Sequence, residues 1–275
     1  LELAFELARR QKAKEPLRAP VYGLRGTAVA LSPHELPEAL EALGRQEIHS
    51  HPPQAKQTGE GAEGLAGSQQ IKTEPLRLPA LQEMVNDFGQ YAQATKLIYR
   101  ESNPGNARPL LQEYGSRQVL VYPPPWPLTT EEMDWVYGLP YTRKPHDKYQ
   151  GHHIAAYEMI KDSITLMRGC FGGCSFCSIT LHEGRRIQNR SEDSVLREID
   201  DMAQKDFGGV VSDLGGPSAN MYRMGCDSGE REAKCKASSC IYPRVCPHLH
   251  VDHGPLRDLY RRVRAHPAVK RAFVA

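Results

Sequence analysis

A short apolar run leads directly into three closely spaced cysteines in the stretch Ile164-Thr165-Leu166-Met167-Arg168-Gly169-Cys170-Phe171-Gly172-Gly173-Cys174-Ser175-Phe176-Cys177. A closed zinc site uses four protein ligands and a four-iron cluster has four irons, so three thiolates leave one position open. Gly172 and Gly173 give the loop the backbone freedom that close approach to a cluster requires. The stretch therefore predicts a strand followed by an iron-sulfur loop with one open iron. Phe176 would shield the cluster or lie against a planar ligand.

This C-x3-C-x2-C motif, with an aromatic residue before its last cysteine, resembles the radical S-adenosylmethionine (SAM) signature. The resemblance implies that Cys170, Cys174 and Cys177 hold a [4Fe-4S] cluster and that SAM binds the fourth iron. It also implies that one electron cleaves SAM to a 5′-deoxyadenosyl radical. The residues alone leave two alternatives, which are a zinc knuckle that borrows a fourth ligand and a redox-active thiol loop.

The composition is that of a globular protein with a hydrophobic core. The chain has 275 residues, of which 40% are hydrophobic, and a formal net charge of +2. No apolar run approaches the roughly 20 residues of a membrane-spanning helix, so we expect a soluble, cytoplasmic protein without a membrane partner. All seven cysteines lie between positions 170 and 246, which favours metal ligands or reactive thiols over a secreted disulfide framework. The net charge is too small to argue for nucleic-acid binding by itself.

Strands and helices alternate from residue 163 onward. The pattern predicts helices at 192–205 and 256–264 and strands at 164–167, 210–213 and 269–274, and Ser191 is predicted to cap the first helix. Such alternation implies parallel strands joined by right-handed crossovers. The predicted fold class is therefore α/β, with a β-α-β-α-β portion of a radical SAM (β/α) barrel. Because a complete barrel takes about 250 residues, we expect an internal fragment of a larger protein with little or no turnover of its own.

The residues before the barrel are expected to be mostly helical and partly disordered. Residues 1–45 read as the tail of a preceding domain, with a helix at 1–14, a short strand at 28–31 and a second helix at 33–44. Residues 46–77 have too few large apolar side chains to fold, which predicts a disordered linker. Residues 78–150 are predicted as a helical and extended region, with one helix at 79–100 and a short strand at 119–121. The core domain would then cover residues 151–275, with a cysteine-rich insertion at 217–254.

Four more cysteines lie in that insertion at C-x8-C-x4-C-x5-C spacing: Cys226, Cys235, Cys240 and Cys246. Four thiolates can close a metal site, and a metal would supply the core that this long connection lacks. A second [4Fe-4S] cluster and a four-cysteine zinc site are both compatible with the residues. The absence of paired C-x2-C knuckles favours the cluster, and unligated loop thiols are the remaining alternative.

Two further features lie where a cofactor would bind. Gly215 and Gly216 follow the second predicted strand, and ligands bind at the carboxyl ends of strands in α/β folds. In the radical SAM family a Gly-Gly pair at this place contacts the SAM amino group, although the acidic residue that commonly follows is replaced here by Pro217. Arginines like Arg190 lie near the SAM carboxylate in several groups of that family, and a guanidinium suits bidentate carboxylate binding.

A closer resemblance covers nearly the whole chain except the linker. The chain is similar to the YgiQ-type radical SAM proteins in these segments: Glu101-Ser102-Asn103-Pro104-Gly105, Met167 through Thr180, Arg190-Ser191-Glu192-Asp193-Ser194, Ser212-Asp213-Leu214-Gly215-Gly216-Pro217 and Ala219-Asn220-Met221-Tyr222. The downstream cysteine spacing also fits. The resemblance implies chemistry and leaves the substrate undefined.

The leading hypothesis from the sequence is a radical SAM enzyme that acts on an unknown substrate and receives electrons from a donor such as flavodoxin or ferredoxin. The alternatives are a non-catalytic iron-sulfur or zinc module for electron transfer or partner binding, and a radical SAM enzyme that modifies tRNA or another RNA. The individual catalytic residues stay undefined.

Overall fold

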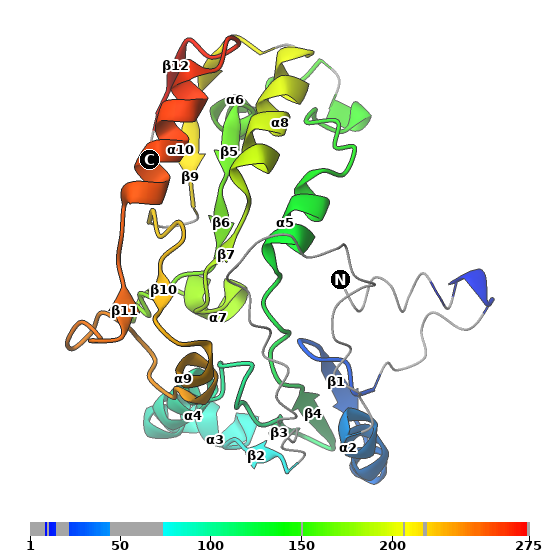
Figure 1. Ribbon diagram of the computed structural model, residues 1–275. Coiled ribbons are helices and arrows are strands. Elements are labelled where there is room, and N and C mark those ends of the chain that lie inside the picture. The colour runs from blue at the N-terminus through cyan, green and yellow to red at the C-terminus, as the bar shows by residue number, and fades with distance from the viewer. Residues whose placement is uncertain are drawn as a thin grey trace. The chain divides into compact units, whose positions relative to one another are not determined.

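The computed structural model describes residue 9 and residues 11–14, 22–44, 74–149, 151–205, 207–216 and 219–273 (Figure 1). By its contacts the chain divides into two compact units. The first comprises Leu1–Trp126 and Ser228–Ser238, and the second comprises Pro127–Asp227 and Ser239–Ala275. Most of the predicted helix at 1–14 and of the predicted linker at 46–77 lies outside the described residues. None of the described helices combines the length and apolar character needed to cross a bilayer.

The first unit is built on a four-stranded sheet in the order β1-β4-β3-β2. Its strands are β1 (Ala28–Leu31), β2 (Leu76–Arg77), β3 (Leu110–Tyr114) and β4 (Arg117–Val121). Tyr114 pairs with Arg117 across a tight hairpin turn, in which Gly115 adopts a φ of +59° that favours glycine. The predicted strand at 119–121 lies within β4, whereas β3 was not predicted, because the adjacent polar residues Gln112 and Glu113 interrupt the apolar alternation of that strand.

The core of the first unit joins the sheet to helix α2 (Leu36–Gly44), which follows the short 3-10 turn η1 (Pro33–Glu35). Ala39 and Leu43 of α2 are fully buried with Leu120 of β4. The hydroxyl of the buried Tyr122 donates a hydrogen bond of 2.9 Å to the carbonyl of Ala39. The predicted strand at 28–31 and helix at 33–44 are confirmed.

Two helices replace the single helix predicted at 79–100. They are α3 (Leu81–Asn86) and α4 (Phe88–Arg100). Asp87 separates them because its backbone is extended and its carboxylate accepts a hydrogen bond of 2.7 Å from the N–H of Gly89. An aspartate in this position begins a new helix rather than continuing the old one.

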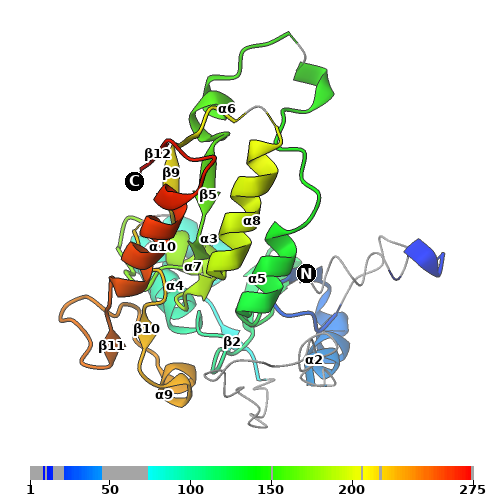
Figure 2. The ribbon, with the colours of Figure 1, turned by 45° about the horizontal axis from the view of Figure 1, so that its top comes forward.

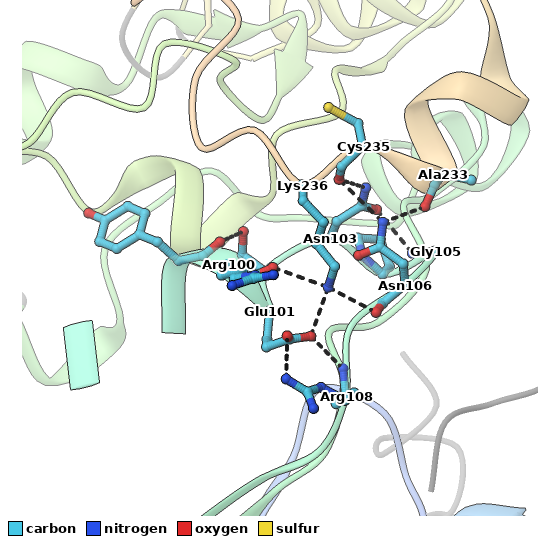
Figure 3. Close-up of polar contacts among 12 residues, drawn as sticks. Arg100, Glu101, Asn103, Gly105, Asn106, Arg108, Ala233, Cys235 and Lys236 are labelled. Atoms are coloured by element: carbon cyan, nitrogen blue, oxygen red, sulfur yellow. Dashed lines mark hydrogen bonds and ion pairs between the residues drawn. The ribbon is translucent and has the colours of Figure 1, made fainter. Parts of the chain in front are cut away.

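The loop at residues 101–108 caps helix α9 (Gly229–Lys234) within the first unit (Figure 3). The Asn103 amide donates to the carbonyls of Glu232 and Cys235 at 2.7 and 2.8 Å. The Asn106 amide donates to the carbonyl of Ala233 at 2.7 Å. Carbonyls at the end of a helix lack N–H groups from a following turn, so these amides supply the missing donors. Asn103 and Asn106 thereby fix the backbone around Cys235.

A buried carboxylate anchors the same loop. The Glu101 side chain is 2% exposed and forms ion pairs with Lys236 at 2.9 Å and Arg108 at 3.2 Å. Burial by itself would raise the pKa of Glu101. The hydrogen bonds from Lys236 and from the backbone N–H of Arg108, together with the Lys236 charge, outweigh this effect and lower the pKa below its ordinary value of 4.5.

Glu101 should make the stability of the first unit depend on pH. A lowered pKa in the folded state means that the ionised carboxylate contributes stability above the unfolded pKa, and that this stability is lost as the pH falls through the folded pKa. The variant Glu101→Gln should lack this contribution. Its melting temperature should therefore fall less than that of the parent when the pH is lowered from 6 to 3, roughly the range over which carboxylates titrate. The exposed Glu113 offers the control Glu113→Gln. An unchanged pH profile in Glu101→Gln would contradict the assignment.

The second unit contains parallel strands joined by helices. Strand β5 (Ser163–Thr165) pairs with β9 (Asp213–Gly215), and β8 (Val210–Val211) pairs with β12 (Arg271–Ala272), both in parallel. Helix α8 (Glu192–Ala203) lies between β5 and β8 in the chain, and α10 (Gly254–Ala265) lies between β9 and β12. The predicted β-α-β-α-β order is therefore confirmed with shorter strands. The described residues form an open α/β arrangement without a closed barrel.

Both long helices cover one side of these strands, and Figure 2 shows α8 and α10 in front of β5 and β9. Ser191 caps α8 by accepting a hydrogen bond of 3.1 Å from the N–H of Ser194, as predicted. The core beneath the helices is formed by buried apolar residues of both helices and the strands: Val195, Ile199, Met202, Leu256, Leu259, Val263, Ile164, Val211 and Leu214. This core fixes the strand ends from which the candidate site is built.

Shorter elements complete the second unit. They are α5 (Thr130–Tyr137), η2 (Asp147–Tyr149), α6 (Ala155–Ile160), β6 (Met167–Arg168), α7 (Ile179–Glu183), β7 (Gln188–Asn189), β10 (Gly225–Cys226) and β11 (Leu249–His250).

Candidate cluster site

The β6–β7 pair presents the cysteine loop. The two strands are antiparallel, and the chain between them carries the three cysteines and helix α7. Gly169 opens the loop with a φ of +96°, and a Cβ on it would lie 2.3 Å from the carbonyl oxygen of Arg186. Only glycine fits this position, and the N–H of Cys170 then donates to the carbonyl of Gly184 at 3.0 Å. The start of the loop is therefore fixed by backbone contacts.

The sulfurs of Cys170 and Cys174 both lie close to Gly172. A Cβ added to Gly172 would be 3.2 Å from Cys170 Sγ and 3.6 Å from Cys174 Sγ. The N–H of Gly172 also donates to Cys170 Sγ at 3.4 Å. Cys170 is buried, Cys174 is exposed and Cys177 is half-buried, with its N–H bonded to the Cys174 carbonyl at 3.0 Å. The loop thus presents thiols along one short, tightly turned backbone.

Thr180 holds the loop from the first turn of α7, a role that the sequence did not reveal. Its buried hydroxyl donates to the carbonyl of Cys170 at 2.9 Å and accepts from the N–H of Gly173 at 3.3 Å. One hydroxyl therefore bridges both ends of the spacer between the first two cysteines. The only feature of the sequence that could have indicated this role is the position of the threonine, three residues after the last cysteine of the motif.

Cysteine thiolates are the ligands that iron-sulfur clusters use. Among the described residues, no group of three or more histidine, cysteine, aspartate or glutamate side chains is arranged to hold a single metal ion. A four-iron cluster makes a different demand, because each thiolate binds a separate iron. Cys170 and Cys174, whose sulfurs both lie near Gly172, are placed to serve as two such ligands. The glycine between Cys170 and Cys174 leaves room that any larger residue would fill.

The glycines at the end of β9, Gly215 and Gly216, lie beside the start of this loop. The N–H of Leu166, next to β6, donates to the carbonyl of Gly215 at 2.8 Å. A Cβ on Gly216 would lie 2.4 Å from Met167 Cε, and one on Gly215 would lie 3.0 Å from Asn220 Oδ1. A larger residue at Gly216 would therefore have to displace the buried Met167 side chain, independently of any cofactor. The structure brings both glycines and the cysteine loop to the same end of the parallel strands.

Phe176 is 91% exposed between the last two cysteines. Its ring is accessible to a ligand, and its predicted role in shielding a cluster or stacking on a planar group stays a prediction.

Arg190, which is predicted to lie near the SAM carboxylate, is held in a network of hydrogen bonds. Its side chain is fully buried, and its guanidinium donates to Glu198 at 2.5 Å and to the Thr165 carbonyl at 2.9 Å. Three further hydrogen bonds reach the hydroxyl and carbonyl of Ser194. The Tyr137 ring lies 4.2 Å from the guanidinium carbon. An arginine side chain has five N–H donors, and these contacts occupy all of them, so none is left for a SAM carboxylate in this geometry.

The second cysteine group is divided between the units. Cys235 belongs to the first unit, and Cys226, Cys240 and Cys246 belong to the second. The N–H of Cys246 donates to the carbonyl of Cys240 at 2.8 Å, and Cys226 pairs with Leu249 in the β10–β11 ribbon. None of the seven cysteines, all within the described residues, forms a disulfide. A metal at this group stays a prediction.

Comparison with known proteins defines the class of this chain. It matches the Radical SAM N-terminal family over residues 2–163 and belongs to that family. The match ends before the cysteine loop, so the family assignment and the geometry of the loop are independent observations.

The particular relatives are UPF0313 proteins. The chain is 54% identical to those of Bradyrhizobium diazoefficiens and Pseudomonas aeruginosa over 73% of its length, and 44% identical to that of Shewanella oneidensis over 98%. These matches confirm the predicted resemblance to YgiQ-type radical SAM proteins. The chain spans only 27% to 38% of the length of these three relatives. No solved structure matches it significantly.

Proposed function

We propose that the whole protein is a radical SAM enzyme whose Cys170, Cys174 and Cys177 bind a [4Fe-4S] cluster. The observation that carries this proposal is the cysteine loop, in which the sulfurs of Cys170 and Cys174 border Gly172 at the end of a strand. Membership in the radical SAM N-terminal family supports it independently. When bound, the cluster would supply the electron that cleaves SAM to a 5′-deoxyadenosyl radical.

The protein's own residues bind and orient the reactants in this proposal. The three thiolates hold three irons and leave the fourth for SAM. Gly215 and Gly216 allow the backbone beside the loop to approach SAM closely, and Phe176 covers the exposed side of the site. Arg190 is a structural residue, and the contact to the SAM carboxylate is left to another group.

The cellular partners follow from the same chemistry. Reduction of the cluster requires a protein electron donor, such as a flavodoxin or ferredoxin. Cysteines without disulfides suit a reducing compartment, which places the protein in the cytoplasm in this proposal. The substrate stays undefined.

The direct test is product formation. Full-length protein, reconstituted anaerobically with iron and sulfide and then reduced, should convert SAM to 5′-deoxyadenosine and methionine, as measured by chromatography with mass detection. Cluster-loaded protein that neither binds nor cleaves SAM would contradict the proposal and favour a non-catalytic iron-sulfur module. RNA that copurifies and is released steeply with salt would identify the substrate class as RNA.

A further inference from the structure

The cysteine-rich connection touches the cysteine loop within the second unit. The Ser239 hydroxyl donates a hydrogen bond of 2.6 Å to the carbonyl of Gly172, and the N–H of Cys240 donates one of 3.0 Å to the carbonyl of Phe171. Both contacts fall on the spacer between Cys170 and Cys174. Segments separated by 67 residues in the chain are therefore joined at the backbone of the candidate site.

Ser239 has a single possible orientation in this arrangement. Its oxygen accepts hydrogen bonds from the N–H groups of Ile241 at 3.1 Å and Tyr242 at 3.0 Å. A serine hydroxyl has two acceptor positions and one proton. The two N–H groups occupy the acceptor positions, so the proton points at the carbonyl of Gly172. Ser239 therefore acts as a fixed donor to the loop.

These contacts fix two successive peptide planes. The peptide between Phe171 and Gly172 is held at its carbonyl by the N–H of Cys240, and its own N–H points at Cys170 Sγ at 3.4 Å. The next peptide is held at its carbonyl by Ser239, and its N–H donates to Thr180 Oγ1 at 3.3 Å. Rotation of either plane would break contacts at both ends. The orientation of the Gly172 N–H toward the sulfur thus depends on the connection.

We infer that Ser239 is a positioning residue for the cluster, and that the segment at 239–242 locks the loop so that the Gly172 N–H stays on the Cys170 thiolate. Hydrogen bonds to cluster sulfurs tune the reduction potential, because they stabilise the more negative, reduced cluster. The lock therefore raises the potential of the cluster and slows loss of iron. This inference rests on the proposed cluster at Cys170, Cys174 and Cys177.

The test compares Ser239→Ala with two matched variants in full-length, cluster-loaded protein. Ser239→Thr retains the hydroxyl, and Ser238→Ala removes an exposed neighbouring hydroxyl. Ser239→Ala should lose iron to a chelator roughly 10-fold faster and have a lower reduction potential, since changes to outer-shell partners cost about 10-fold to 100-fold in metal affinity. Ser239→Thr and Ser238→Ala should behave as the parent protein. Identical iron loss and potential in Ser239→Ala would overturn the inference.

A second readout needs no cluster. In the metal-free protein the buried Cys170 thiol should be alkylated about fivefold faster in Ser239→Ala, the factor expected from losing one ordinary hydrogen bond. Peptide mass spectrometry measures this rate, with an unchanged far-ultraviolet circular dichroism spectrum as the control for folding. An unchanged rate would contradict the lock. Failure of the parent protein to cleave SAM, with both Ser239 effects present, would instead reject the proposed enzyme and leave the lock standing.

Discussion

The variant Cys174→Ala should show SAM cleavage at background level in the reconstituted full-length protein. Removing one of three thiolates leaves an iron without its protein ligand, and even changes to outer-shell partners of metal sites cost about 10-fold to 100-fold. We therefore expect a loss of more than about 100-fold in the rate of 5′-deoxyadenosine formation, together with loss of the cluster absorption.

The control for Cys174→Ala is Ser175→Ala, which changes an exposed side chain in the same loop and should retain cleavage. A second control is Cys226→Ala in the downstream cysteine group, which should retain the cluster at the first group. Cleavage that persists in Cys174→Ala would rule out the assigned ligand set.

The variant Arg190→Met should lower the stability of the second unit by about 3–5 kcal/mol, because it leaves the mostly buried carboxylate of Glu198 without one of its two ion-pair partners. Glu198 also pairs with Arg143, which would retain part of the compensation. Thermal unfolding, followed by circular dichroism, measures the change. A loss of this size corresponds to a fall of at least about 6 °C in melting temperature for a unit of this size.

The control for Arg190→Met is Arg261→Met on helix α10. Arg261 forms an exposed pair with Asp258, and exposed pairs contribute only about 0–1 kcal/mol. A stable Arg190→Met protein that selectively loses SAM binding would contradict the structural role and restore the ligand role predicted from the sequence.

The helical half of the second unit could be predicted because its signals are local. Ser191 and the apolar face of α8 are visible within one window of sequence, and so is the amphipathic pattern of α10. The cysteine loop is equally local, since its spacing and glycines occupy eight consecutive residues. Features of this kind need no knowledge of distant contacts.

The features that could not be predicted depend on long-range contacts. In the β3–β4 hairpin polar residues are adjacent, at Gln112-Glu113 and Arg117-Gln118, so the sheet rather than an apolar alternation stabilises it. The roles of Thr180 and Ser239 depend on backbone carbonyls that only folding brings within reach. The sequence suggested Arg190 as a SAM ligand because it does not show that the side chain is buried. The packing of α5, α8 and β5 determines both this burial and the contact with the Glu198 carboxylate.

The central claim is that three thiolates hold a cluster whose remaining iron is free to bind SAM. Mössbauer spectra of full-length protein loaded with isotopically labelled iron, recorded with and without SAM, test it most directly. We predict four irons per cluster, one of which changes its signal when SAM is added. The claim would be contradicted if SAM changed the signal of none of the irons. It would also be contradicted if the protein bound tetrahedral zinc at Cys170, Cys174 and Cys177 in place of iron.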